Sequence, residues 1–294
     1  MKSGFITIIG RPNVGKSTLL NAIIGEKISI VSSKPQTTRG KITGIYNREN
    51  LQLVFIDTPG VHKPKNKLGE KMIRDINEAV DGVDCAVLVV EPRSPGKTEK
   101  ELITRFKNDG VPLILVINKT DSVKKDYVAK AIIEYSELAD FAAVVPLSAL
   151  KKDNISPLID EITKFAHGDT AYYPDDISTD RTERQLVSEI LREKLIRRLD
   201  DEVPHGINIE IDSFKEREDK PLVEIMATVV CERASHKGII IGKNGEGIKK
   251  AATAAREDME KLLGKKVYLE LFVKTVNNWR EKDKYLAEFG FNNE

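Results

Sequence analysis

The chain has 294 residues, 40% of them apolar, which favours two domains that each bury a hydrophobic core. Its 47 lysines and arginines balance 46 aspartates and glutamates to a formal net charge of +1, so any basic surface for nucleic acid must be local. No apolar run approaches the about 20 residues with which a helix spans a bilayer, so we expect a soluble protein.

Short apolar runs alternate with longer amphipathic segments in the first half of the chain. This alternation predicts an α/β fold, with a mostly parallel sheet and helices on both faces. The predicted strands cover residues 5–9, 51–56, 85–90, 113–117 and 143–147. The runs near 85–90 and 113–117 lack polar alternation, so we expect them to be central strands, and Cys85 and Cys231 to be buried core residues.

The segment Gly10 to Ser17 has the pattern G-x-x-x-x-G-K-S and lies between a predicted strand and a predicted helix. Its glycines allow backbone N–H groups to wrap a phosphate, and the N-terminus of the helix adds favourable partial charge. We expect Lys16 to reach the β- and γ-phosphate oxygens and the Ser17 hydroxyl to coordinate Mg²⁺.

A second motif, Asp57-Thr58-Pro59-Gly60, follows the predicted strand 51–56. Its position puts an acidic residue at the carboxyl end of a strand, beside the phosphate loop. We expect Asp57 to hold magnesium through water and the Gly60 N–H to meet the γ-phosphate.

The choice of base depends on Asn118-Lys119-Thr120-Asp121, at the end of the predicted strand 113–117. The Asp121 carboxylate can accept from both N1–H and the exocyclic amine of guanine, whereas adenine would leave it facing lone pairs, a mismatch of roughly several kcal/mol. The nucleotide is therefore expected to be GTP. Ser148-Ala149-Leu150 follows the next strand and fits a backbone donor to guanine O6.

The pattern breaks at residues 167–181, which are rich in turn formers and acidic residues, so we place a domain boundary there. The predicted domains are 1–170 and 182–294, joined by a linker at 171–181. The second domain is predicted to contain a helix at 182–199, strands at 207–214 and 222–231, an apolar stretch ending at Gly242 to Gly245, a helix to about Leu263, a strand at 266–274 and a final helical segment.

The loop Gly242-Lys243-Asn244-Gly245 and this order of elements match an α+β type II KH domain, in which a G-x-x-G loop clamps a nucleic-acid backbone. From His236 to Lys282 there are 11 Lys plus Arg and 6 Asp plus Glu, an excess of 5 basic residues (11 − 6). This excess is the local basic surface that RNA binding requires. Two alternatives for this loop are a plain glycine-rich turn between two helices, with the lysines on a solvated helix face, and a second nucleotide-binding loop.

The four nucleotide motifs, in this order, resemble the translation-factor-like GTPases. Longer stretches narrow the resemblance to the Era family of the TrmE-Era-EngA-YihA-Septin-like superfamily: residues 11–21, 35–39 and 57–64, and in the second domain 235–245 and 273–280. The resemblance covers nearly the whole chain. Ala251 and Ala252 depart from the family pattern, a change that affects helix packing more than RNA contact.

The resemblance implies a P-loop GTPase domain followed by the KH domain, with a threonine at 35–39 completing the magnesium shell. Thr38 is the assigned residue and Thr37 the alternative. Val61 stands where Ras-like enzymes have a glutamine, so intrinsic hydrolysis is expected to be slow. Asn13 occupies the position at which related potassium-activated GTPases bind a monovalent cation, so K⁺ is a second predicted cofactor; otherwise Asn13 is only a turn former.

The resemblance also implies that the partners are GTP and GDP, the 3′ end of 16S rRNA and the 30S subunit during its assembly. We expect a cytoplasmic monomer, with peripheral association at the inner face of the cell membrane left open. One alternative is a membrane-associated signalling GTPase with a non-RNA partner, and another is a binding module without turnover. Trp279 either stacks on a base or belongs to the core.

The predicted site residues fall into four overlapping sets. The catalytic residues are Lys16, Thr38, Gly60 and Asn13, and the metal ligands are Ser17, Thr38 and Asp57. The GTP-binding residues are Gly10, Arg11, Pro12, Asn13, Val14, Gly15, Lys16, Ser17, Thr18, Asp57, Thr58, Pro59, Gly60, Asn118, Lys119, Asp121, Ser148, Ala149 and Leu150. The RNA-binding residues are Lys237, Gly242, Lys243, Asn244, Gly245, Lys249 and Lys250.

Overall fold

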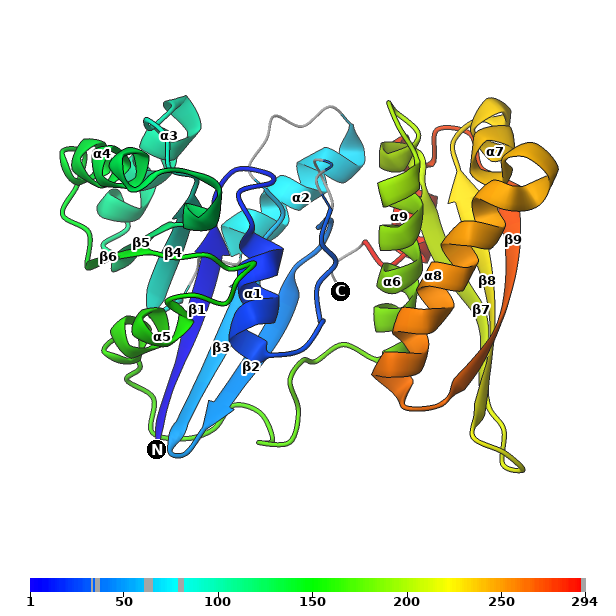
Figure 1. Ribbon diagram of the computed structural model, residues 1–294, viewed down its shortest axis with the longest axis horizontal. Helices are drawn as coiled ribbons and strands as arrows, with labels where there is room; N and C mark the ends of the chain where they lie inside the picture. The colour runs from blue at the N-terminus through cyan, green and yellow to red at the C-terminus, as the bar shows by residue number, and fades with distance from the viewer. Residues whose placement is uncertain (33, 35–37, 61–65, 79–81, 292–294) are drawn as a thin grey trace. The chain divides into compact units, whose positions relative to one another are not determined.

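A computed structural model describes residues 1–32, 34, 38–60, 66–78 and 82–291, and these residues divide into two compact units (Figure 1). Among the described residues, the first unit contains 1–31, 38–60, 72–78 and 82–180, and the second contains 32, 34, 66–71 and 181–291.

The first unit is built on a six-stranded sheet with the strand order β2-β3-β1-β4-β5-β6. The strand β2 is antiparallel to β3 and the other neighbours are parallel, as predicted for a mostly parallel sheet. The strands are β1 (Lys2–Ile9), β2 (Ile42–Arg48), β3 (Leu51–Asp57), β4 (Cys85–Val90), β5 (Leu113–Ile117) and β6 (Ala143–Pro146).

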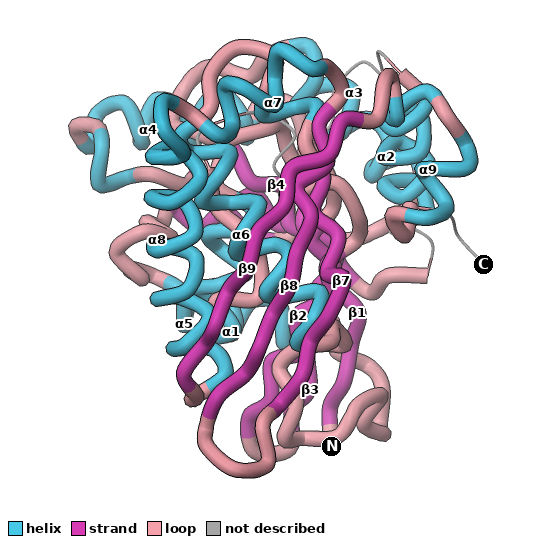
Figure 2. Tube along the Cα trace, turned by 90° about the vertical axis from the view of Figure 1, so that its right-hand side faces the viewer, coloured by secondary structure: helices cyan, strands magenta, loops and turns pink. Residues whose placement is uncertain are grey.

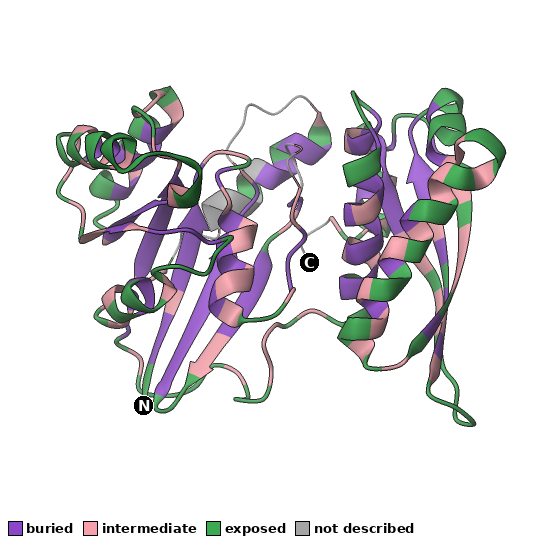
Figure 3. Ribbon diagram, in the orientation of Figure 1, coloured by how far each residue is buried: buried purple, intermediate pink, exposed green. Residues whose placement is uncertain are grey.

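Helices cover both faces of this sheet. On one face, α1 (Lys16–Ile24) and α5 (Ile155–Thr163) share a core cluster with Val87 and Val89 of β4. On the other, α3 (Lys97–Asn108) and α4 (Lys125–Ser136) share a cluster with Leu88. Figure 3 shows the strands buried along most of their length, which explains why their sequences lack polar alternation. The remaining elements are α2 (Lys67–Glu78) and a short 3₁₀ turn (Thr120–Ser122).

The strand β2 was not predicted from the sequence. Gly44 lies in its middle, and glycine lowers the strand signal because it offers no side chain to pack. The reason for the glycine is tertiary: a Cβ at this position would lie 2.6 Å from Leu20 Cδ1 and 2.9 Å from Ile28 Cδ1. Because α1 packs closely on the sheet, this position requires glycine, and the glycine weakens the sequence pattern by which a strand is predicted.

Residues 168–179 form a strap that runs beside β2 and β3, although the sequence shows only a break there. Gly168 and Ser3 exchange two backbone hydrogen bonds of 2.9 Å, and Ile45 N donates to Ser178 O at 2.8 Å. The fully buried Gln52 side chain accepts from Tyr172 N and Tyr173 N and donates to Tyr173 O at 2.8 Å. Much of the predicted linker is thus attached to the first unit.

The second unit contains a three-stranded sheet in the order β7-β8-β9 (Figure 2). The strand β7 is antiparallel to β8, and β8 is parallel to β9. Alternate residues of β8 are buried, which matches a sheet covered on one face by α6 and α8. The elements are α6 (Glu183–Arg198), β7 (Asn208–Glu216), β8 (Leu222–Cys231), α7 (Ala234–Ile241), α8 (Glu246–Leu263), β9 (Lys266–Thr275), α9 (Asp283–Glu288) and 3₁₀ turns at Pro204–Gly206, Lys243–Gly245 and Trp279–Glu281.

Two local features of this unit answer questions raised by the sequence. The helix predicted at 182–199 begins after Thr182, whose hydroxyl accepts from Gln185 N while the Gln185 side chain accepts from Thr182 N, forming a capping box. Trp279 is completely buried, and its Nε1–H donates to Gly206 O at 2.9 Å. Of the two interpretations of Trp279, the core residue is the one observed.

Candidate nucleotide site and nucleic-acid interface

The phosphate loop connects β1 to α1, and its shape depends on two glycines. Gly10 has φ of 144°, and a Cβ there would lie 2.4 Å from Val89 O. Gly15 has φ of 101°, and a Cβ there would lie 2.2 Å from Asn118 Nδ2. Asn13 has φ of 66°, a left-handed conformation that asparagine adopts more readily than most residues. The loop is therefore packed against neighbouring strands by its own backbone.

Lys16 lies on the inner side of this loop. Its Nζ donates to Gly10 O and Arg11 O, both at 3.3 Å, and only 6% of the residue is exposed. Burial lowers the pKa of Lys16 from its ordinary value, and the nearby Asp57 carboxylate partly opposes that effect. Lys16 is thus a buried cation that the two loop carbonyls help to solvate.

Three oxygen-bearing side chains meet at the start of α1. Ser17 Oγ donates to Asp57 Oδ2 at 2.7 Å and lies 3.0 Å from Thr38 Oγ1. Hydroxyl and carboxylate oxygens are the hard ligands that Mg²⁺ prefers, so the predicted metal ligands fit that ion. The alternative ligand, Thr37, lies outside the described residues.

The Asp57–Gly60 motif follows β3 and packs on the phosphate loop. Thr58 Oγ1 donates to Ile8 O at 3.0 Å, which ties the motif to β1. A Cβ on Gly60 would lie 2.7 Å from Pro12 N and 2.8 Å from Pro12 Cα, so only glycine fits beside the loop in this conformation. Val61, on which the expectation of slow hydrolysis depends, lies outside the described residues.

The predicted base-binding residues meet beside the phosphate loop. Asn118 Nδ2 donates to Val14 O at 2.8 Å, and Asn118 Oδ1 accepts from Ala149 N at 3.0 Å. Ser148 Oγ donates to Asp121 Oδ1 at 2.6 Å, which orients that carboxylate. Asn118 therefore ties three motifs together, while Asp121 is exposed and Leu150 is 72% exposed.

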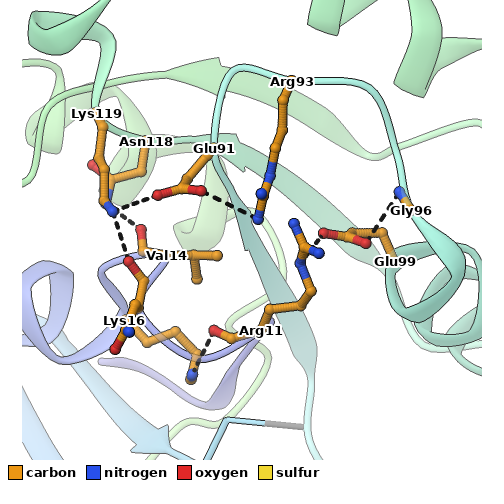
Figure 4. A network of polar contacts seen from close by, with 10 residues as sticks. Arg11, Val14, Lys16, Glu91, Arg93, Gly96, Glu99, Asn118 and Lys119 are labelled. Atoms are coloured by element: carbon orange, nitrogen blue, oxygen red, sulfur yellow. Dashed lines mark hydrogen bonds and ion pairs between the residues drawn. The ribbon is translucent and has the colours of Figure 1, made fainter. Parts of the chain in front are cut away.

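The sequence did not reveal a network of ion pairs around the loop, shown in Figure 4. Glu99 Oε1 lies 2.6 Å from Arg11 Nε, and Glu91 Oε1 lies 2.5 Å from Lys119 Nζ. Lys119 Nζ also donates to Asn13 O at 2.6 Å. Glu91 and Glu99 flank a turn after β4 and belong to no recognisable motif, so only the fold shows where they point.

In the second unit, the Gly242–Gly245 loop joins α7 to α8. Gly242 has φ of 72°, and a Cβ there would lie 2.9 Å from Gly247 N; Gly245 has φ of 78°, with nothing within 4 Å of its ideal Cβ. Asn244 also has positive φ, at 51°. The first glycine is required by close packing, whereas the second leaves the loop surface open to a ligand backbone.

The predicted RNA-binding side chains lie around this loop on the solvent side. Lys243 and Asn244 are exposed, as are Lys237 on α7 and Lys249 and Lys250 on α8. A carboxylate is nearby, since Glu246 Oε2 lies 3.6 Å from Lys250 Nζ. The lysines remain available because this pair is itself solvent-exposed.

In the described part of the chain, no three or more His, Cys, Asp or Glu side chains gather as a metal cluster. Among the described residues, none of the helices combines the length and the apolar character that crossing a membrane would need.

Comparison with known proteins supports both units. Residues 5–119 match a family described as 50S ribosome-binding GTPase, and residues 202–280 match the KH domain family. GTPase Era of Clostridium kluyveri is 50% identical over 292 residues, which cover 99% of each chain. GTPase Era of Clostridioides difficile is 47% identical over 293 residues, again 99% of each chain.

Two solved structures are similar over the full length of both chains. One is an Aquifex aeolicus Era variant bound to GDP and AlF4⁻, with 35% identity and a TM-score of 0.95. The other is Era in complex with MgGDPNP and nucleotides 1506–1542 of 16S ribosomal RNA, with 36% identity and a TM-score of 0.95. With its P-loop GTPase domain and its KH domain, the chain belongs to the Era family of GTPases.

Proposed function

We propose that this GTPase is a molecular switch that binds the 3′ end of 16S rRNA through its KH domain and acts in assembly of the 30S subunit. The observation that carries the proposal is the open Gly242–Gly245 loop with its exposed lysines, in a chain similar over its whole length to an Era structure that contains 16S rRNA. We assign residues 1–170 to the GTP-binding domain, 171–181 to the linker and 182–294 to the KH domain.

At the nucleotide site, the chain's own side chains supply base choice and charge. Asp121, held by Ser148, accepts from guanine, and Lys16 neutralises the β- and γ-phosphate oxygens. Ser17, Thr38 and Asp57 would hold Mg²⁺, which supplies further neutralisation of the phosphates when bound. The Gly60 N–H meets the γ-phosphate from beside Pro12.

Because a valine stands at position 61, no side chain there can orient the attacking water, and stabilisation of the transition-state charge by a cation would compensate. Asn13 projects from the phosphate loop in a left-handed conformation, and we assign it as the ligand of a K⁺ ion beside the phosphates. Exchange of potassium for sodium is expected to slow single-turnover hydrolysis in the wild type but not in Asn13→Ala. Equal rates of the wild type in the two salts would contradict this assignment.

The switch role is supported by the segments that follow the phosphate loop and the Asp57 motif. Described residues 32, 34 and 66–71 group with the second unit. Lys34 Nζ donates to Leu199 O and, at 2.6 Å, to Asp200 Oδ1, while Lys67 Nζ lies 2.5 Å from Asp283 Oδ2. Ordering of these segments by the γ-phosphate would therefore alter contacts with elements of the second unit.

The test is RNA affinity in two nucleotide states. The complex with a non-hydrolysable GTP analogue is expected to bind a 3′-terminal 16S rRNA oligonucleotide more tightly than the GDP complex. Lys243→Glu with Lys249→Glu should weaken both, whereas Lys97→Glu with Lys100→Glu, an equal change of charge on α3, should not. RNA affinity that survives the first pair would favour a non-RNA partner for this domain, and equal affinities in the two states would exclude the coupling.

A further inference from the structure

The phosphate loop is supported from outside by the segment that follows β4 and by the first turn of α3. Glu99 contacts the loop at Arg11, where Oε1 lies 2.6 Å from Nε (Figure 4). Two residues further along the phosphate loop, Asn13 O accepts from Lys119 Nζ at 2.6 Å, and Lys119 is itself paired with Glu91. The three residues Arg11 to Asn13 are thus held at one end by Glu99 and at the other by Lys119, which is paired with Glu91.

The Glu99 contact is the more buried of the two. Its side chain is 2% exposed, compared with 28% for Arg11, and its second oxygen accepts from Gly96 N at 3.1 Å. A buried carboxylate is strongly disfavoured unless it is paired and hydrogen-bonded. Gly96 N supplies the hydrogen bond and Arg11 supplies the cation, so we expect the ion pair to hold the Arg11 side chain in place.

The fixed arginine controls the position of the backbone next to it. Arg11 O is an acceptor for Lys16 Nζ, and Pro12 follows directly in the chain. Pro12 is the surface on which Gly60 lies, because a Cβ on Gly60 would come within 2.7 Å of Pro12 N. A displacement of Arg11 would therefore move the surface that sets the place of Gly60.

We propose that Glu99 is a positioning residue for GTP hydrolysis, acting through Arg11 on the packing of Pro12 against Gly60. The proposal rests on the role proposed above for the Gly60 N–H at the γ-phosphate. GDP lacks that phosphate and is held by Lys16 and by the base-binding residues. Loss of the Glu99 charge should thus slow the chemical step much more than it weakens GDP binding.

The variant that isolates this role is Glu99→Gln. Glutamine can still accept from Gly96 N at this helix position, so the cap of α3 is retained while the charge that holds Arg11 is removed. Single-turnover hydrolysis should fall by roughly 10- to 100-fold, the usual effect of a misplacement of about 1 Å, with GDP affinity near that of the wild type. The matched control is Glu101→Gln on the same helix, whose carboxylate is 62% exposed and which should hydrolyse like the wild type.

A second variant approaches the pair from the other side. Arg11→Gln should reproduce the loss, and the double variant with Glu99→Gln should be no slower than the slower single variant, because both break one interaction. Thermal unfolding with saturating GDP shows whether each variant is folded. Hydrolysis by folded Glu99→Gln at the rate of Glu101→Gln, an equal loss of GDP affinity and rate, or multiplicative losses in the double variant would each overturn the inference.

Gly60→Ala separates this inference from the function on which it rests. If Gly60→Ala hydrolyses GTP at the wild-type rate, the role of Gly60 is wrong. If Gly60→Ala is slow and Glu99→Gln is not, only the positioning role of Glu99 fails.

Discussion

Lys16 is a residue whose pKa is expected to change when nucleotide binds. Its Nζ is buried against Gly10 O and Arg11 O, and burial lowers its pKa while Asp57 raises it to a smaller extent. Phosphate oxygens add negative charge next to this amine, so they shift the pKa back upward.

The consequence is a proton linkage. Because burial lowers the pKa of Lys16, the free protein loses this proton at a lower pH than an ordinary lysine does, and nucleotide binding favours the protonated amine. GDP binding should therefore take up protons, with uptake increasing as the pH rises toward the pKa of the free protein. Titration calorimetry in two buffers of different ionisation enthalpy measures this quantity. Lys16→Arg should abolish the uptake, and proton release in the wild type would contradict the assignment.

Trp279 offers a clean test because it is the only tryptophan in the chain. It is completely buried, donates to Gly206 O and stacks with Phe291 at a ring-centroid distance of 6.1 Å. Its emission should be blue-shifted, poorly quenched by acrylamide and unchanged when RNA binds. Quenching by a saturating RNA oligonucleotide, with no change in acrylamide access, would instead indicate base stacking.

At the scale of the elements, the strap at 168–179 is attached to the first unit largely through one buried side chain, Gln52. The buried Gln52 amide makes hydrogen bonds to Tyr172 N, Tyr173 N and Tyr173 O, and also to Asn47 Oδ1 at 2.9 Å. The hydrogen-bonding capacity of this side chain is thus fully used, with three bonds to the strap and one to β2.

Removal of that side chain leaves several polar groups without partners. Gln52→Ala should lower the free energy of unfolding of the first unit by about 2–4 kcal/mol, at about 1 kcal/mol for each lost bond. Urea denaturation measures the loss. The comparison is Gln185→Ala, which removes an exposed capping residue and should cost about 0.5–1 kcal/mol from the second unit. Losses of equal size would show that the strap is not held through Gln52.

At the scale of the whole molecule, the two units have separate sheets, and we expect GDP to bind only the first unit. Trp279 reports only on the second unit, whereas circular dichroism reports on both. GDP at about 100 times its dissociation constant should stabilise the first unit by about 2.7 kcal/mol and leave the Trp279 transition nearly in place. Thermal unfolding followed by both signals tests this expectation. A shared shift of the two transitions would show that the units unfold together.

The sequence by itself determined the phosphate loop, the Asp57 motif, the base motif and the Gly242–Gly245 loop. Each of these sites needs particular residue types at fixed spacing in a continuous segment, so each can be recognised from the local sequence. The predicted strands were found for a similar reason, because burial on both faces gives uninterrupted apolar runs such as Leu113–Ile117.

Tertiary structure decided the features that join distant segments. The strand β2 was hidden by Gly44, whose reason is the approach of α1, and the strap was hidden because its partner Gln52 lies over a hundred residues away. Glu99 belongs to no motif until the fold places it 2.6 Å from Arg11. The sequence therefore specified the groups that we expect to meet the ligand, whereas the packing of distant elements specified what holds those groups in place.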